Sequence, residues 1–228
     1  MYSLKDLVLF NTESWFGLYQ TVNDQYWPLY LVGLVWGVLA IYISFTQKSS
    51  QFILLFVVAS GLWLLNAMIF HWGEHQQLSW VASYYGWAFI AQALLLFFCA
   101  FLTLISDQYH RKKQELTNNI VINSGRLLLF SALVIVPILG LIEGRDWTSL
   151  DVVGLGPDST ALATIGLVLL SFQTKVLKIL LYFIPTLWLI ISAATAWPMG
   201  LFQGLGCLLI WLLVIIFLYT YIKRQKTL

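Results

Sequence analysis

The sequence predicts an all-α membrane protein, a bundle of about seven transmembrane helices preceded by an amphipathic interfacial segment. Hydrophobic residues make up 60% of the 228 residues and charged residues only 10%, whereas soluble domains are about half apolar and a quarter charged. Aromatic residues reach 16% and include 11 tryptophans, and such rings concentrate where helix ends meet lipid headgroups. The net charge of +2 gives no reason to expect nucleic acid as a partner.

Seven stretches of the chain are candidate spans. A helix needs about 20 apolar residues to cross the hydrocarbon core, because lipid offers the backbone no hydrogen-bond partner. The stretches that approach this length are 28–47, 52–70, 83–105, 127–143, 159–173, 177–197 and 200–222. The fifth has a short apolar core, and Pro157 fixes where it begins. Six spans with one re-entrant segment are therefore the main alternative to seven.

The chain divides into an interfacial segment (1–27), a transmembrane domain (28–222) and a basic tail (223–228). In the first segment apolar residues recur at helical spacing. Asn11 can cap a short helix there, and Glu13 would lie in its first turn, where a negative charge is favourable. We expect one or two helices lying at the outer interface, with a loosely ordered tail as the alternative.

The basic residues predict the orientation. If the chain crosses seven times, ten of the twelve lysines and arginines fall on one side, and only Lys5 and Arg145 fall on the other. Because basic loops stay in the cytoplasm, the N-terminus is expected outside and the C-terminus in the cytoplasm. Six spans would move Lys175 and Lys178, or the C-terminal basic cluster, to the wrong side, so seven are preferred.

Two histidines and a glutamate stand at the outer end of the second span, in a segment His-Trp-Gly-Glu-His. His71 and His75 are four residues apart, so both rings face one way if the helix continues through Gly73. Together with Glu74 they suit a zinc-like or copper-like ion, and histidine also titrates near neutral pH. The alternative is an interfacial helix end with hydrogen-bonded histidines and a tryptophan anchor.

The outer stretch 143–158 carries four carboxylates, those of Glu143, Asp146, Asp151 and Asp158. Carboxylates can attract hard or borderline cations, and Asp158 is therefore added to the tentative metal ligands His71, Glu74 and His75. The expected cofactor, if there is one, is a divalent metal ion. The spacing matches no calcium loop, however, and a solvated acidic loop followed by a helix that Asp158, Ser159 or Thr160 caps is the alternative.

Polar side chains are few within the spans, and no Asp, Glu, Lys or Arg lies in the middle of any of them. We expect Asn66, Gln92, Thr164 and Gln203 to hold helices together through hydrogen bonds, with Asn66 and Gln92 meeting on consecutive spans. The lack of a charged residue in mid-span argues against a proton-coupled pump with a central carboxylate. No zinc-protease, serine-hydrolase, phosphate-loop or paired-cysteine motif is found, which leans against an enzyme.

Four segments are distinctive: LKDLVLFNTESWFGLYQTVNDQYWP near the start, FHW at 70–72, AFIAQALLLFF at 88–98 and GPDSTALATIGLVLL at 156–170. Together they resemble an uncharacterised bacterial family of multi-pass membrane proteins, domain-of-unknown-function family 6064. The resemblance implies a place in the bacterial inner membrane and a Pro-led fifth span, matched here by Pro157 and Thr160. Where relatives often carry a Cys-Pro pair this chain has Asp158 and Ser159. If that Cys is a soft-metal ligand in the relatives, Asp158 favours a harder ion here, or no ion. The resemblance implies no particular activity.

Three functions remain open. The first is a small transporter or channel-like protein whose outer vestibule gathers His71, Glu74, His75 and Asp158 around a cation or small solute. The second is a non-catalytic accessory or assembly subunit, packed against another membrane subunit or a second copy of itself within the lipid bilayer. The third is a membrane enzyme acting on a lipid-like substrate, with His71 or His75 as the base.

Overall fold

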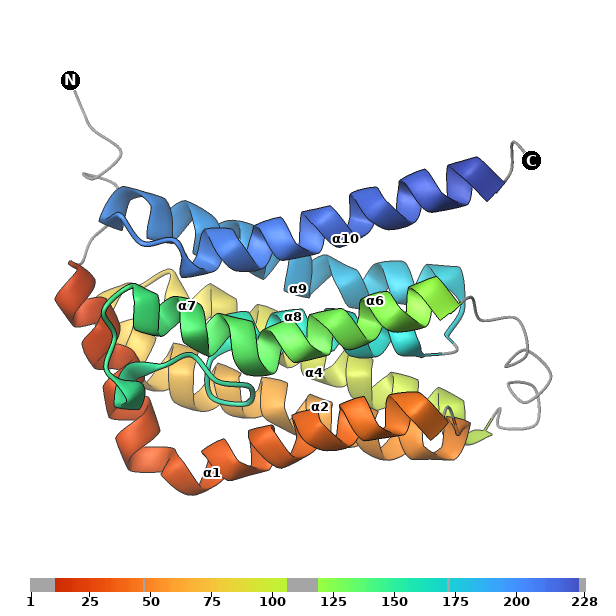
Figure 1. Ribbon diagram of the computed structural model, residues 1–228. Coiled ribbons are helices and arrows are strands. Elements are labelled where there is room, and N and C mark those ends of the chain that lie inside the picture. Colours follow the sequence, from red (N-terminus) through yellow and green to blue (C-terminus); the bar gives the residue numbers. More distant parts are fainter. Residues whose placement is uncertain (1–10, 47, 106–118, 172, 226–228) are drawn as a thin grey trace.

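The computed structural model is a bundle of helices, and no strand occurs among the residues that it describes, 11–46, 48–105, 119–171 and 173–225 (Figure 1). The longer helices are α1 (Thr12–Thr46), α2 (Ser49–Leu65), η2 (Asn66–His75), α4 (Ala82–Ile105), α6 (Asn119–Phe130), α8 (Pro157–Leu170), α9 (Lys175–Ala196) and α10 (Gln203–Gln225). The shorter ones are α3 (Gln76–Leu78), η4 (Ser131–Ile135), α7 (Val136–Ile142), η5 (Trp147–Ser149) and η6 (Trp197–Met199).

Six helical stretches in the described part of the chain are long and apolar enough to cross a membrane. They are Thr12–Thr46, Ser50–Leu78, Ala82–Ile105, Asn119–Ile142, Lys175–Met199 and Gln203–Gln225, and each coincides with one predicted span. The remaining prediction, 159–173, corresponds to α8, which has only 14 residues. A helix of that length is about 21 Å long, shorter than a hydrocarbon core of about 30 Å. The predicted all-α membrane fold is confirmed, with six full-length helices and one short one.

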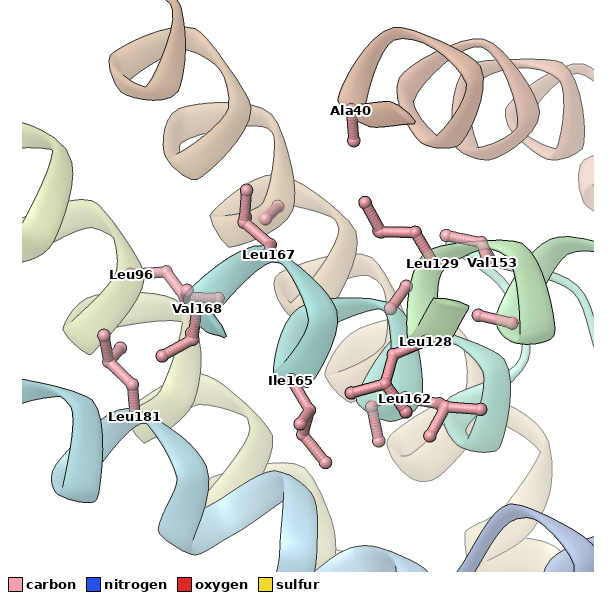
Figure 2. Close-up of a cluster of buried hydrophobic side chains, with 14 of the residues drawn as sticks. Ala40, Leu96, Leu128, Leu129, Val153, Leu162, Ile165, Leu167, Val168 and Leu181 are labelled. Atoms are coloured by element: carbon pink, nitrogen blue, oxygen red, sulfur yellow. The ribbon is translucent and has the colours of Figure 1, made fainter. Parts of the chain in front are cut away.

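The short helix α8 forms the centre of the bundle, and all of its residues are buried. It packs mainly against α6 and α9. In Figure 2 its side chains Leu162, Ile165 and Val168 lie among those of Leu128 from α6 and Leu181 from α9. A helix that is apolar on every side is typical of a fully enclosed position. The position of α8 inside the bundle therefore follows from its composition.

Helix α1 is broken at Tyr26, whose φ of −118° and ψ of 24° are not helical. Pro28 follows two residues later, and proline removes a backbone donor and disfavours helical geometry just before it. The predicted cap is confirmed, since the Asn11 side chain accepts a hydrogen bond from the Ser14 N–H at 2.8 Å. The first part of α1 buries a set of side chains against the rest of the bundle: Trp15, Leu18, Tyr19 and Val22.

The segment between α7 and α8, residues 143–156, enters the bundle. Residues 149–156 are all buried, whereas Gly144, Asp146 and Trp147 are exposed. The alternative of a solvated acidic loop is therefore wrong for the second part of the segment, which contains Asp151. Gly154 has a φ of 101°, a conformation that glycine adopts without steric cost, and a Cβ there would lie 3.3 Å from the Cα of Gly33 on α1. A Cβ on Gly33 would overlap the carbonyl oxygen of Val153. Gly33 therefore permits the close approach of this loop to α1.

The described start of α1 and the end of α10 lie at opposite ends of the bundle (Figure 1). α8 begins inside the bundle, where the loop enters, and ends near the start of α9. The loop and α8 together thus run along the bundle once, from the end where α7 stops to the end where α9 begins. Basic residues gather at the end where α2 and α9 begin and α10 stops: Lys48 precedes α2, Lys175 opens α9, and Lys223 and Arg224 lie in the last turn of α10.

Candidate functional site

Asp151, in the loop before α8, binds the amino end of that helix. Its carboxylate accepts hydrogen bonds from the backbone N–H groups of Asp158 at 3.1 Å and Ser159 at 3.0 Å, and from the Ser159 hydroxyl at 2.5 Å. The first N–H groups of a helix lack intrahelical partners and carry partial positive charge. The prediction that Asp158, Ser159 or Thr160 caps α8 is wrong, because no side chain caps at the N-cap residue Gly156 and Asp151 supplies the carboxylate from outside the helix.

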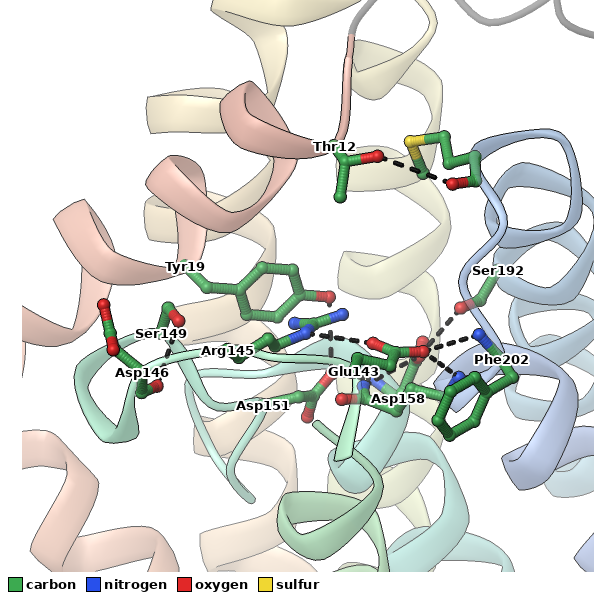
Figure 3. Close-up of polar contacts among 12 residues, drawn as sticks. Thr12, Tyr19, Glu143, Arg145, Asp146, Ser149, Asp151, Asp158, Ser192 and Phe202 are labelled. Carbon is green, nitrogen blue, oxygen red and sulfur yellow. Dashed lines mark hydrogen bonds and ion pairs between the residues drawn. The ribbon is translucent and has the colours of Figure 1, made fainter. Parts of the chain in front are cut away.

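Asp158 lies inside the bundle, with only 2% of its surface exposed. One carboxylate oxygen accepts a hydrogen bond from the Trp188 indole nitrogen at 2.8 Å. The other accepts from the Ser192 hydroxyl at 2.7 Å and from the Gln203 side-chain nitrogen at 3.5 Å (Figure 3). Asp158 therefore joins α8 to α9 and α10.

Glu143 and Arg145 form a buried ion pair beside these two aspartates (Figure 3). The Arg145 Nε lies 3.2 Å from a Glu143 carboxylate oxygen, and the two side chains are 2% and 1% exposed. Glu143 also accepts hydrogen bonds from the backbone N–H groups of Phe202, at 2.6 Å, and Gln203, at the start of α10. The Arg145 guanidinium lies over the Tyr19 ring, 4.7 Å from its centroid.

We call Glu143, Arg145, Asp151 and Asp158 the carboxylate cluster. Its three carboxyl groups and one guanidinium would carry a net charge of −2 if all were ionised, and burial opposes such an excess. Burial, and next the charge of Asp158, raise the pKa of Asp151 to about 7, although its hydrogen-bond donors and Arg145 oppose the shift. Burial also raises the pKa of Asp158, against its own donors. The cluster therefore favours the uptake of a proton or of another cation.

The first part of α1 holds the loop of the cluster in place. The Tyr19 hydroxyl donates a hydrogen bond to Asp151 at 3.4 Å. The Asn23 side-chain nitrogen donates to the carbonyl oxygens of Thr148 at 2.8 Å and Leu150 at 2.9 Å. The segment predicted to lie at the interface thus also forms a wall of the site.

In the described part of the chain, two polar atoms at the cluster are buried without a hydrogen-bond partner: Nη1 of Arg145, a member of the cluster, and Oε1 of Gln203 beside it. The nitrogen of the same Gln203 amide donates to Asp158, so the unpaired oxygen lies next to the cluster. A buried acceptor without a donor costs about 1–3 kcal/mol. A cation or a proton donor placed there would relieve that cost.

The two histidines of the sequence motif do meet. The helix continues through Gly73 as the π-helix η2, and the Nδ1 atoms of His71 and His75 lie 3.3 Å apart. Both rings are buried, 0% and 3% exposed. They are surrounded by aromatic rings. The ring centroids of Phe89 and Trp188 lie 4.3 and 4.9 Å from that of His71.

The proposed four-ligand metal site is not assembled in the structure. No group of three His, Cys, Asp or Glu side chains among the described residues could hold a metal ion. The Glu74 carboxylate accepts a hydrogen bond from the Gln77 side chain at 3.2 Å. Asp158 is bound by donors from α9 and α10, as described above. His71 and His75 are the only two of the four predicted ligands that the fold brings into contact among these residues.

The predicted intramembrane polar residues all make contacts between segments. Asn66 donates to the carbonyl oxygen of Gly154 at 2.8 Å, and Gln92 donates to that of Leu181 at 3.2 Å. The prediction that these two amides contact each other is therefore wrong, because each donates to a backbone carbonyl of another segment. Thr164 accepts a hydrogen bond from the indole nitrogen of Trp63 at 2.7 Å. Gln203, the fourth, is part of the site through its contact with Asp158.

The comparison with protein families gives one match, to a family of unknown function named DUF6064, over residues 12–227. The chain belongs to the DUF6064 family. The DUF6064 match begins with the first part of α1 and extends past α10, so the carboxylate cluster and the histidine pair both lie within it. Neither the comparison with curated proteins nor that with solved structures gives a match.

Proposed function

We propose that this DUF6064 protein is a small transporter-type membrane protein that binds a cation, with the proton as the first candidate, at the carboxylate cluster. The observation that carries the proposal is the charge imbalance of the cluster, three buried carboxyl groups with one guanidinium. A charge imbalance of this kind is removed by a bound proton or cation. The unpaired oxygen of Gln203 beside Asp158 supports the same interpretation.

The helix arrangement adds independent support. Ion and substrate sites of many transporters lie where a helix is interrupted inside the bundle, because the helix end offers unpaired backbone groups. α8 starts inside the bundle after a buried loop, and its amino end lies at the cluster. The absence of charged residues from the middle of the predicted spans had argued against a proton-coupled pump. That argument does not apply to carboxylates that a loop brings into the interior.

We further propose that the cluster faces the outside of the bacterial inner membrane, with the C-terminus in the cytoplasm. The basic residues at the ends of α2, α9 and α10 support this orientation, since basic segments stay cytoplasmic. Labelling of single cysteines in intact cells tests it. Cysteine at Lys223 should be protected from an impermeant reagent and cysteine at Trp147, which is 78% exposed, should react. The reverse pattern would invert the orientation.

The transport proposal is tested in proteoliposomes that contain a pH-sensitive dye. A gradient of Na⁺, K⁺, Mg²⁺ or Zn²⁺ is imposed in turn, and the internal pH is followed. We expect at least one cation to drive a pH change in the wild type, and the change to be lost in Asp158→Asn and in Asp151→Asn. Asp146→Asn is the matched control, because Asp146 is exposed. A change of equal size in the aspartate variants, or no response to any cation, would contradict the proposal.

Zinc binding to the histidines is measured separately. Purified protein is titrated with Zn²⁺ and Cu²⁺, and the wild type is compared with the double variant His71→Ala/His75→Ala. If the two histidines form a metal site, the double variant loses binding. If the two proteins bind alike, or if neither binds these ions, the histidines form no metal site.

A second candidate function is an accessory subunit. It is favoured by α10, since only 17% of its most apolar stretch is buried, which leaves a wide apolar face for a neighbouring subunit. Purification from native membranes in a mild detergent tests it. A stoichiometric second subunit would support this function, and a monomer without a partner would count against it.

A further inference from the structure

The first part of α1, residues 12–25, lies across one end of the bundle (Figure 1). Its aromatic side chains cover the carboxylate cluster. The ring centroids of Phe16 and Tyr19 lie 4.8 and 4.7 Å from the guanidinium carbon of Arg145, and the Tyr19 hydroxyl donates a hydrogen bond to Asp151. This segment is therefore a cover of the cluster at that end.

The same segment covers the histidine pair. The Trp15 ring packs edge-on against His75, with the ring centroids 5.4 Å apart. His75 is 3% exposed and Asp151 is 0% exposed, so the structure shows both polar regions closed to solvent. An ion can reach them only after some part of the bundle moves, and proteins commonly admit ligands through such movements of a segment or a hinge.

A hinge for such a movement lies at the break in α1. Tyr26 has non-helical φ and ψ, and Pro28 follows within the helix. Hinges are a few residues at the ends of elements that absorb a change in backbone angles. Beside the break, Asn23 binds two carbonyl groups of the entering loop at 2.8 and 2.9 Å. The segment is thus held firmly next to the hinge.

Hydrogen bonds are longer towards the start of α1. The Tyr19 hydroxyl lies 3.4 Å from Asp151, and the Thr12 hydroxyl lies 3.5 Å from the carbonyl oxygen of Met199. Hydroxyl donors usually lie about 2.5–3.0 Å from their acceptors. These two contacts are therefore weak, and they are the ones that a rotation about the break would separate.

The opposite wall of the cluster is held by shorter bonds. Trp188 and Ser192 of α9 donate to Asp158 at 2.8 and 2.7 Å, and the backbone N–H of Phe202 before α10 donates to Glu143 at 2.6 Å. Opening the cluster towards α9 or α10 would break these bonds. The first part of α1 is therefore the side that opens at the lower cost.

The apolar packing of α1 divides in the same way. Buried apolar side chains of the described residues form two separate groups. The four from the first part of α1 belong to the smaller group, whereas those from the second part, such as Trp36 and Ala40, belong to the larger group around α8. A movement of the first part would open the smaller group and leave the larger one intact.

We propose that residues 12–25 form a gate, which rotates about the break at Tyr26 and Pro28 to admit water and a cation to the carboxylate cluster and the histidine pair. The structure is then the closed state of this gate. The inference rests on the proposed function in one respect, because the cation that the gate admits is the one that the cluster binds.

A reversible link between the start of α1 and the turn before α10 tests the gate. In Thr12→Cys/Met199→Cys a short bis-methanethiosulfonate reagent joins the two thiols, and a reductant releases them, so one sample serves as both the locked and the free protein. Hydrogen–deuterium exchange of the backbone amides of residues 149–159 is followed by mass spectrometry. We expect exchange to slow at least about tenfold in the linked protein and to recover after reduction.

Phe45→Cys/Arg126→Cys is the matched control. The Arg126 guanidinium lies over the Phe45 ring at 4.0 Å, so the same reagent would join α1 to α6 on the other side of the break. This link should leave the exchange of residues 149–159 unchanged. Equal exchange in the linked and the reduced Thr12→Cys/Met199→Cys protein would overturn the proposal. So would wild-type exchange at 149–159 as slow as that at 161–170, the enclosed part of α8.

Cation-driven pH changes in proteoliposomes separate this inference from the proposed function. Linked Thr12→Cys/Met199→Cys protein should give less than about a tenth of the wild-type response and should recover after reduction. If the wild type responds and the link alters neither the response nor the exchange, the gate is wrong and the proposed function stands. If the wild type responds to no cation while the link still slows exchange, the gate stands and the transport proposal is wrong.

Discussion

The indole nitrogen of Trp188 lies 2.8 Å from a carboxylate oxygen of Asp158 and donates a hydrogen bond to it. The same indole ring packs edge-on against His71, with the ring centroids 4.9 Å apart. One side chain of α9 therefore contacts both the carboxylate cluster and the histidine pair. His75 and Asp158 are 83 residues apart in the sequence, yet the histidine pair and the carboxylate cluster lie against the same side chain, that of Trp188.

Replacing Trp188 by phenylalanine should destabilise the protein through Asp158. Trp188→Phe keeps a ring but removes the N–H, and a hydrogen bond to a charged group contributes about 1.5–3 kcal/mol. Trp211→Phe is the control, because its N–H donates to the neutral Thr186 hydroxyl at 3.0 Å and should cost only about 1 kcal/mol. Thermal unfolding in detergent at about pH 8 measures both. Equal losses would mean that Asp158 is not ionised in the folded protein.

Sequence reasoning succeeded where one local pattern decides the structure. Long apolar runs predicted the six full-length helices, and Asn11 was recognised as a cap because capping depends on neighbouring residues only. The pairing of His71 and His75 also followed from helical spacing. The cap and the histidine pair depend on residues within about five positions of each other, so the local sequence is sufficient to predict them.

The composition of the site could not be predicted in the same way. Trp188, Ser192 and Tyr19 contact the aspartates only because α9 and the first part of α1 pack against the entering loop. Trp188 and Ser192 lie inside an apolar span, and nothing in their spacing refers to Asp158. The one available signal was α8 itself. A segment with no polar face, too short to span, must be enclosed by other helices, and an acidic residue at its start is then enclosed with it.

The close approach of α1 to the entering loop should make Gly33 intolerant of a side chain. In Gly33→Ala the added methyl group would overlap the carbonyl oxygen of Val153, so the loop must move, at a cost of about 3 kcal/mol. Gly61→Ala is the control, since nothing lies within 4 Å of its added carbon and alanine favours helix by about 1 kcal/mol. Thermal unfolding should show a loss for the first and a small gain for the second. A stable Gly33→Ala would mean that the loop does not lie against α1.

Asn23 should hold the entering loop against the first part of α1. In Asn23→Ala the carbonyl groups of Thr148 and Leu150 lose their donor, and each buried unpaired group costs about 1–3 kcal/mol. We expect the segment 143–156 to become accessible to limited proteolysis at temperatures where the wild type resists. Asp24→Ala changes the adjacent exposed residue and should cleave like the wild type. Identical cleavage of both variants would show that the loop is held by other contacts.

The raised pKa of Asp151 predicts that acidification stabilises the protein. The pKa is about 7 in the folded protein, against 3.8 for an unperturbed aspartate, so the folded state retains a proton that the unfolded chain has released. Stability must then fall as the pH rises from about 4 to about 7, and it should level off above that range. Between about pH 5 and about pH 8 we expect the unfolding temperature of the wild type to drop by several degrees.

Asp151→Asn should flatten this pH dependence, because asparagine keeps an acceptor for the amino end of α8 and does not titrate. Asp146→Asn, at an exposed position, should retain the wild-type slope. If the proteoliposome assay identifies a cation other than the proton, that cation should restore the stability of the wild type at about pH 8 and leave Asp151→Asn unchanged, because it would replace the lost proton at the same carboxylates. If Asp151→Asn kept the full slope, the proton would be held elsewhere, and Asp158→Asn would be the next variant to measure.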